Sequence, residues 1–129
     1  MTKIISPIYI TLPRKTKADK KYSLNLNQYR NWHYAISNNI KKAYYEIIKD
    51  QIKDLKFNKP VSIGFDLYKG SKRKIDRSNI LSIVEKFFCD SLVEAGAIPD
   101  DNDSYIKGTL YSTAGIDRDN PRCEIFIYE

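Results

Sequence analysis

The feature that most constrains the fold is the alternation between two hydrophobic periods along the 129 residues. Some runs are rich in β-branched and aromatic residues, which is typical of strands, whereas two longer stretches repeat apolar residues about every 3.6 positions, as helices do. The strand-like runs are residues 4–12, 61–68, 105–112 and 122–128, and the helical stretches are residues 28–55 and 76–95. This β-α-β-α-β-β order predicts a single α+β (mixed α/β) domain, with one mixed sheet packed against two helices.

The apolar residues of each helical stretch define the face that we expect to be buried. In the first stretch they are Trp32, Ile36, Ile40, Ala43, Ile47 and Leu55, and in the second Ile80, Ile83, Val84, Phe87, Phe88, Leu92 and Val93. Gly96 is expected to end the second helix. Residues 13–23 have five basic side chains and no apolar period, so we predict a loop there.

Composition excludes several classes of protein. With 42% hydrophobic and 29% charged residues, the chain is close to the average for a globular domain. It has no apolar run that could form a transmembrane helix or a signal peptide. Cys89 and Cys123 lack the spacing of a zinc site, and we expect both to be reduced in a cytoplasmic protein.

The charge is unevenly distributed along the chain. Residues 1–75 carry 17 lysines and arginines against 5 acidic residues, and residues 76–129 carry 5 against 11. A net charge of +12 in the first part suggests a polyanionic partner, although unevenly charged solvated faces would give the same count.

Few residues are candidates for chemistry. There is no glycine-rich phosphate loop and no nucleophile elbow, and His33 is the only histidine. We expect His33 to be a packed or solvent-facing residue, and Cys89 to belong to the core.

The carboxylates are the remaining candidates. Asp76 follows the basic turn Lys69–Lys74, Asp90 lies within the second helix, and acidic residues cluster at 100–103. Oxygen ligands beside cations are what Mg²⁺-dependent phosphodiester cleavage requires. The structural alternative is that Asp76 is an N-cap and that residues 100–103 form a polar turn.

Helix geometry limits which acids can meet. Asp76 and Asp90 are 14 residues apart, roughly 21 Å along a continuous helix, and within one subunit they cannot bind one ion. The residues after Gly96 are long enough to bring Asp101 back beside the middle of the helix, near Lys86 and Asp90.

The order of these motifs resembles the RusA-type Holliday-junction resolvases. The resemblance is carried by residues 72–79 (KRKIDRSN), by Lys86 with Asp90-Ser91-Leu92, by Ala95-Gly96, and by Asp100-Asp101, with a weaker likeness in Ile10-Thr11-Leu12-Pro13. It implies that Asp76 and Asp101 are catalytic metal ligands, that Lys86 is catalytic, and that Asp90 is a further metal ligand. Two features depart from the family pattern: Ser78 replaces an expected aspartate, and the interval from Asn79 to Lys86 is about one helical turn longer. Glu85, Asp90 or Asp100 are candidates to replace the missing carboxylate.

The resemblance also implies a homodimer that uses Mg²⁺, without a small-molecule cofactor, to nick opposed strands of a four-way DNA junction. Such enzymes are carried mostly by phages and prophages, which implies action in the bacterial cytoplasm and not at a membrane. The expected phosphate-binding residues are Arg14, Lys15, Lys17, Lys20, Lys21, Lys72, Arg73 and Lys74. The aromatic residues between positions 22 and 45 are candidates either for stacking on unpaired bases or for the core.

Two other functions fit the same residues. One is a non-catalytic protein that binds junctions or other DNA on the same fold, which Ser78 makes reasonable. The other is a structure-selective nuclease that acts on flaps or forks.

Overall fold

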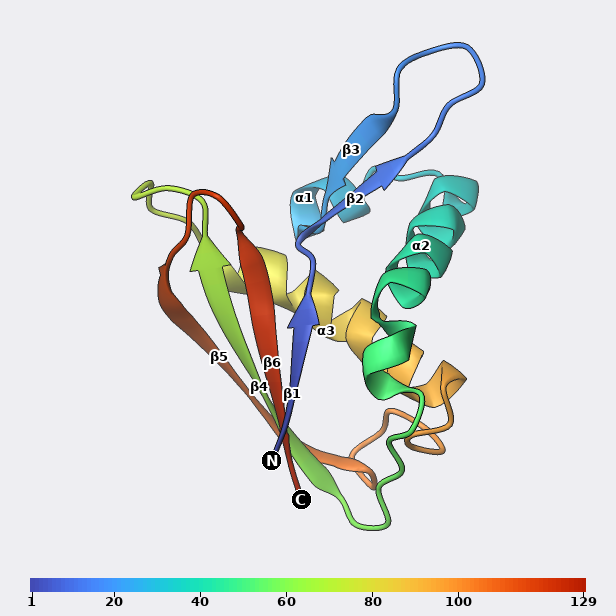
Figure 1. Ribbon diagram of the computed structural model, residues 1–129, viewed down its shortest axis with the longest axis vertical. Helices are drawn as coiled ribbons and strands as arrows, with labels where there is room; N and C mark the ends of the chain where they lie inside the picture. The colour runs from blue at the N-terminus through green and yellow to red at the C-terminus, as the bar shows by residue number, and fades with distance from the viewer.

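Four strands form a mixed sheet in the order β1-β6-β4-β5 (Figure 1). In the computed structural model, which describes residues 1–129, these strands are β1 (Thr2–Ser6), β4 (Val61–Lys69), β5 (Ile106–Ile116) and β6 (Arg122–Tyr128). β4 and β5 are parallel, whereas β6 runs antiparallel to both β4 and β1. The predicted α+β class and mixed sheet are therefore confirmed.

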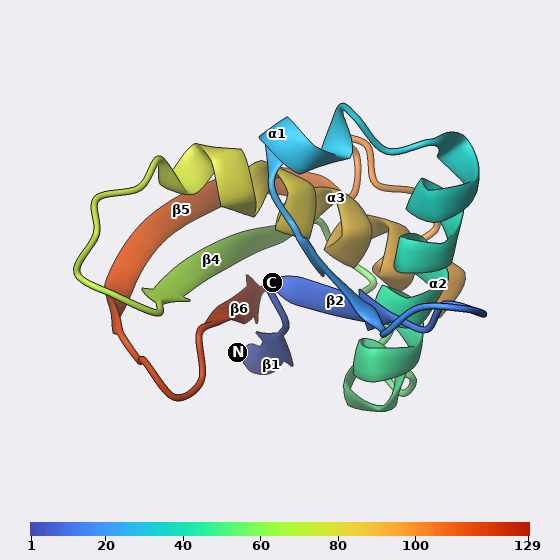
Figure 2. The same cartoon turned by 90° about the horizontal axis from the view of Figure 1, so that it is seen from above.

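The core lies between this sheet and the helices. Alternate residues of β4 are buried, and they are in register with the buried residues of β6, for example Phe65 opposite Ile125. The helix α3 (Arg77–Glu94) covers this face, and Figure 2 shows it lying along the curved sheet with α1 (Leu26–Tyr29) above it and α2 (Tyr34–Ile52) beside it. Phe88 of α3 meets Phe65 edge to face, with 6.1 Å between the ring centroids. Burial of these aromatic rings together with the aliphatic side chains around them stabilises the fold.

The second predicted helix is confirmed and the first is wrong in part. α3 begins after Asp76 and ends before Gly96, whose φ of +78° is the left-handed conformation that glycine adopts most readily. The predicted helix 28–55 is instead two helices, because the chain leaves the helical conformation before His33 caps α2. Trp32 lies outside both helices.

The buried face of α2 also differs from the expected one. Its buried residues are Ile40, Tyr44, Ile48 and Ile52, whereas Ile47, which we predicted to face inward, is 53% exposed. The buried residues follow one another at intervals of four, so their stripe turns slowly around α2 and leaves Ile47 at its margin.

The predicted strand 4–12 is in fact two strands, and the predicted loop 13–23 ends in a strand. The chain turns at Pro7 and Ile8, so that β2 (Tyr9–Leu12) leaves the main sheet and pairs with β3 (Lys20–Ser23). Ile10 and Tyr22 of these strands are buried in the core, while the loop that joins the strands extends away from the body of the protein in Figure 1. β5 also runs to Ile116, beyond the predicted end at Ser112.

The two edges of the main sheet differ. At β1, the side-chain amide of Gln51 in α2 accepts a hydrogen bond from the Ile5 N–H and donates one to the Ile5 carbonyl, both at 2.8 Å. The amide thus takes the place of a neighbouring strand. The opposite edge strand, β5, has no strand or comparable side chain along its outer side.

An ionic network joins the ends of β1, β5 and β6. Arg122 contacts Asp117 at 2.8 Å and Glu124 at 2.7 Å, and Lys3 contacts Glu124 at 3.0 Å. Burial raises the pKa of Glu124, but the hydrogen bonds from Lys3 and Arg122 outweigh this and hold that pKa below its usual value. The hydrogen bond from Arg122 likewise lowers the pKa of Asp117.

This network predicts an acid-dependent loss of stability. A carboxylate whose pKa is lowered in the folded state stabilises the fold fully when the pH is above the pKa of the unfolded state. That stabilisation of Asp117 and Glu124 is lost as the pH falls through their lowered pKa values. We expect Arg122→Gln to lower the midpoint of urea unfolding at about pH 7, and to lower it much less at about pH 3. An equal decrease at both pH values would contradict this assignment.

No helix in the structure has the length and apolar character needed to cross a membrane.

Candidate functional site

One hollow between α3 and β5 brings together most of the chemically useful side chains. It has a volume of about 390 Å³ and is open to solvent. Its lining residues are Ser82, Glu85, Lys86, Cys89, Asp101 and Tyr111. Sequence geometry predicted that Asp101 would return beside the middle of the helix near Lys86, and the structure places both in this hollow.

Glu85 is held in place from the sheet. The Tyr111 hydroxyl of β5 donates a hydrogen bond to the Glu85 carboxylate. Burial, followed by this carboxylate, raises the pKa of Tyr111, so the phenol keeps its proton and remains a donor. The interaction leaves carboxylate oxygen capacity at Glu85 for a further partner.

The acidic loop after α3 divides its carboxylates between two roles. Asp100 accepts hydrogen bonds from the Asp101 N–H at 2.8 Å and from the Asn102 amide at 3.0 Å, and the Asn102 side chain accepts from the Ser104 N–H. The expected polar turn is therefore present, and Asp100 and Asn102 build it. No side-chain hydrogen bond or ion pair engages the Asp101 carboxylate, and Asp101 is one of the residues that line the hollow.

Cys89 and Ser82 also line the hollow, and both are shielded from solvent in part. Burial, and then the charges of Glu85, Asp101 and Asp90, raise the pKa of Cys89, so its thiol stays protonated. Cys89 is thus a core residue, as expected, and not a nucleophile. The Ser82 hydroxyl oxygen is buried without any hydrogen-bond partner, which is unusual for a native polar atom.

Asp90 lies in a different environment. It faces α2 and forms an ion pair with Lys41 at 3.5 Å, in a groove that also includes Lys42 and Glu94. On an α-helix, positions 85 and 90 differ by about 140° around the axis. The structure therefore does not bring Asp90 to the hollow that holds Asp101.

Asp76 is the N-cap of α3. Its side chain accepts a hydrogen bond from the Ser78 N–H at 3.1 Å, so the structural alternative for this residue is correct. Because α3 is continuous, Asp76 is roughly 14 Å from Glu85 along the axis. One chain does not place Asp76 beside Asp101.

Two substitutions separate the capping role of Asp76 from any role of its charge. Asp76→Ala removes the cap and is expected to lower the free energy of unfolding by about 1 kcal/mol. Asp76→Asn retains a capping oxygen and is expected to preserve most of that stability. Urea unfolding measures both, and equal losses in the two variants would contradict the capping role.

The predicted phosphate-binding residues lie in two exposed segments away from the termini, which Figure 1 shows on opposite sides of the molecule. Arg14, Lys15 and Lys17 are in the connection between β2 and β3, and Lys20 and Lys21 begin β3. Lys72, Arg73 and Lys74 are in the turn between β4 and α3. The Lys20 and Lys21 ammonium groups lie over the Tyr22 and Tyr9 rings, at 5.0 and 3.9 Å from the centroids.

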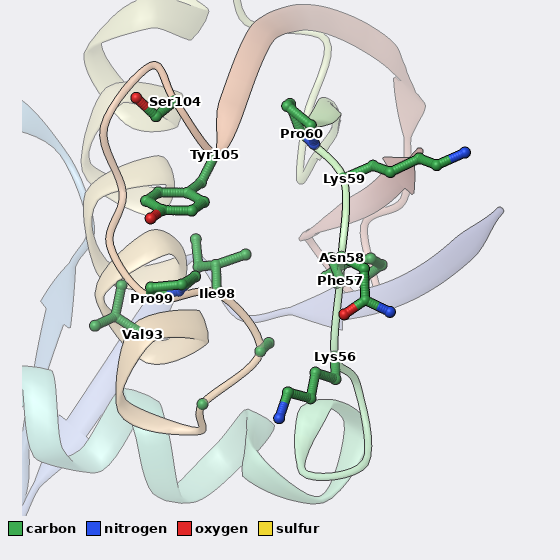
Figure 3. A pocket seen from close by; sticks show the side chains of 12 residues that line it. Lys56, Phe57, Asn58, Lys59, Pro60, Val93, Ile98, Pro99, Ser104 and Tyr105 are labelled. Atoms are coloured by element: carbon green, nitrogen blue, oxygen red, sulfur yellow. The ribbon is translucent and has the colours of Figure 1, made fainter.

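A larger hollow, of about 590 Å³, is elsewhere. Figure 3 shows Val93, Ile98, Pro99 and Tyr105 grouped on one side of it, while the Lys59 side chain extends away. Its lining includes no Asp, Glu, His or Cys. This hollow therefore offers no carboxylate, imidazole or thiol that could bind a metal ion.

The structure contains no group of three or more His, Cys, Asp or Glu side chains arranged to hold a metal ion. The three predicted ligands, Asp76, Asp90 and Asp101, thus occupy three separate places. Glu85 stands out as the acid that shares a hollow with Asp101, and the sequence offered it only as one of several alternatives. No sequence signal identified Tyr111 or Ser82, because both depend on how β5 lies against α3.

Comparisons of the chain with protein-family models and with curated proteins found no match.

Proposed function

We propose that this protein is a Mg²⁺-dependent endodeoxyribonuclease that resolves four-way DNA junctions by paired nicks in opposed strands. The observation that carries the proposal is the meeting of Glu85, Asp101 and Lys86 in one solvent-open hollow. The motif order that resembles the RusA-type resolvases supports the same class of reaction.

The donor set of the hollow fits Mg²⁺. This ion is usually held by one or two carboxylates, with water and substrate phosphate completing its coordination, so Glu85 and Asp101 suffice. The unpartnered Ser82 oxygen supports a polar ligand in the same place. When bound, such an ion supplies Lewis-acid polarisation of a phosphodiester and makes nearby water more acidic.

The protein's own residues have complementary roles. Glu85 and Asp101 would hold the ion, and Tyr111 would orient Glu85 through its hydrogen bond. The exposed Lys86 ammonium would bind the phosphate that is cleaved. The two basic segments would bind the DNA backbone through contacts that weaken as salt rises.

Asp76 enters this proposal through a second copy of the chain. A single chain keeps Asp76 roughly 14 Å from Glu85, whereas in a homodimer Asp76 of one copy is free to approach the hollow of the other. A two-fold enzyme also suits a junction with matching symmetry.

The decisive experiment incubates the protein with a synthetic four-way junction, a fork, a flap and a linear duplex of the same sequence, with Mg²⁺ or with EDTA. Paired nicks in the junction that require Mg²⁺ would support the proposal. Preferred cleavage of the fork or flap would instead identify a structure-selective nuclease. Junction binding that weakens with salt, without any cleavage, would identify a non-catalytic DNA-binding protein.

A mixing experiment tests the role of the second copy. If each site combines Asp76 of one copy with Asp101 of the other, a dimer of Asp76→Asn and Asp101→Asn chains contains one intact site. After subunit exchange, an equal mixture should recover about a quarter of the wild-type nicking rate, although each variant alone is inactive. No recovery would restrict each site to one chain.

The proposed activity belongs to the cytoplasm of a bacterial host, with the gene carried by a phage or prophage.

A further inference from the structure

The aromatic residues between positions 22 and 45 divide into packed rings and one free ring. Tyr44 is fully buried and Tyr22 is 7% exposed, while Tyr45 packs against the core. Trp32 is held edge to face by Tyr22 and by Tyr29, at centroid distances of 5.9 and 5.7 Å. Tyr34 is different, because it is 75% exposed.

His33 supports one face of the Tyr34 ring. The two rings have centroids 4.5 Å apart and planes inclined by 35°. His33 is also the N-cap of α2, where its Nδ1 accepts a hydrogen bond from the Ala35 N–H at 3.2 Å. This hydrogen bond fixes the imidazole, so Tyr34 rests on an immobilised ring and presents its other face to solvent. A group held in this way loses little conformational freedom when it binds a partner.

All the charged side chains in the segment around Tyr34 are cations. From Lys20 to Tyr45 the chain has five lysines and arginines and no carboxylate. α2 also packs against β2, which pairs with the strand that holds Lys20 and Lys21, and Figure 1 shows the start of α2 beside these two strands. An exposed aromatic ring among cations has the two properties used to bind single-stranded nucleic acid, since bases stack on the ring and phosphates pair with the cations.

We propose that the open face of Tyr34 stacks on an unpaired DNA base, and that this contact favours branched or single-stranded DNA over a continuous duplex. A base within a duplex already stacks on its neighbours, whereas a base at a branch point has a free face. This inference rests on the proposed function for its choice of DNA, but it concerns recognition and not cleavage.

The experiment measures binding in EDTA, where no metal-dependent cleavage interferes. A four-way junction with 2-aminopurine at the branch point and a duplex with the same fluorescent base in a paired position are titrated with each protein. We expect the wild type to quench the junction probe, and Tyr34→Ala to bind the junction about tenfold more weakly without quenching. Affinity for the duplex should be unchanged, because the basic segments that bind phosphates are intact.

Three variants serve as controls. Tyr34→Phe keeps the ring and should behave as the wild type. His33→Asn keeps an N-cap acceptor but removes the supporting ring, so it should weaken junction binding with little loss of stability. Tyr128→Ala removes a 45%-exposed ring from β6 and should leave binding unchanged. Equal affinity of the wild type and Tyr34→Ala for the junction would overturn the inference.

The binding test of Tyr34 and the cleavage test of the proposed function can fail independently of each other. Tyr34-dependent quenching by a protein that does not cleave any DNA would sustain the inference and refute the nuclease. Mg²⁺-dependent cleavage with unchanged junction binding by Tyr34→Ala would do the opposite.

Discussion

Replacing Asp101 by asparagine is expected to reduce Mg²⁺-dependent junction cleavage by about 100-fold or more, with little change in DNA binding. Asparagine keeps the size of the side chain and removes its charge. Since no hydrogen bond or ion pair uses the Asp101 carboxylate within the chain, the fold should be unaffected. Glu85→Gln should have a similar effect, because glutamine can still accept the Tyr111 hydrogen bond but attracts a divalent cation weakly.

Asp103→Asn is the matched control for these variants. Asp103 is exposed in the same loop as Asp101 and does not line the hollow. Its substitution makes the same change in net charge and should leave the cleavage rate unchanged. Rates are compared at saturating protein with the nicked strands resolved on a denaturing gel. An Asp101→Asn protein that cuts like the wild type would remove Asp101 from the reaction.

Among these variants, the largest loss of stability is expected when Ile48 of α2 is replaced by alanine. Ile48 is fully buried, and Ile48→Ala is expected to lower the free energy of unfolding by about 2–5 kcal/mol, because the variant loses apolar burial and leaves a cavity. Urea unfolding followed by circular dichroism measures this loss.

Ile47→Ala makes the same chemical change one position earlier. The Ile47 side chain is half exposed, and alanine has a higher helix propensity, so we expect a change of about 1 kcal/mol or less. The pair therefore tests the phase of α2 directly. Equal losses, or a larger loss for Ile47→Ala, would contradict the orientation of this helix.

The helices and strands differ in how well the sequence predicts them. β4 and α3 were predicted nearly to the residue, because β4 alternates strictly and α3 has a cap, a continuous apolar stripe and a terminal glycine. In the region of α2, apolar residues recur at helical spacing through the break, since Trp32 packs against the core from outside a helix. No proline or glycine marks the break, and the N-cap is a histidine, which is not among the usual capping residues.

The hairpin and the site were predictable to different extents. β3 has no strand-like apolar pattern, because it pairs only with β2 and buries one residue, Tyr22. The return of Asp101 to the middle of α3 followed from chain length and helix rise alone. The hollow that Asp101 shares with Glu85, and the hydrogen bond from Tyr111, depend on how β5 lies against α3, which no local pattern encodes.

The unequal edges of the main sheet limit how the chain can polymerise. Exposed strand edges are the usual template for continuous β-stacking of identical molecules, which ends in fibres when both sides of each molecule can add another. Here the Gln51 amide already uses the outward N–H and carbonyl of Ile5 at the β1 edge, whereas β5 has no neighbour on its outer side. A strand from another molecule must therefore displace Gln51 to add at β1, but displaces nothing at β5. Substitution of Gln51 by a side chain without an amide would remove this difference between the two edges.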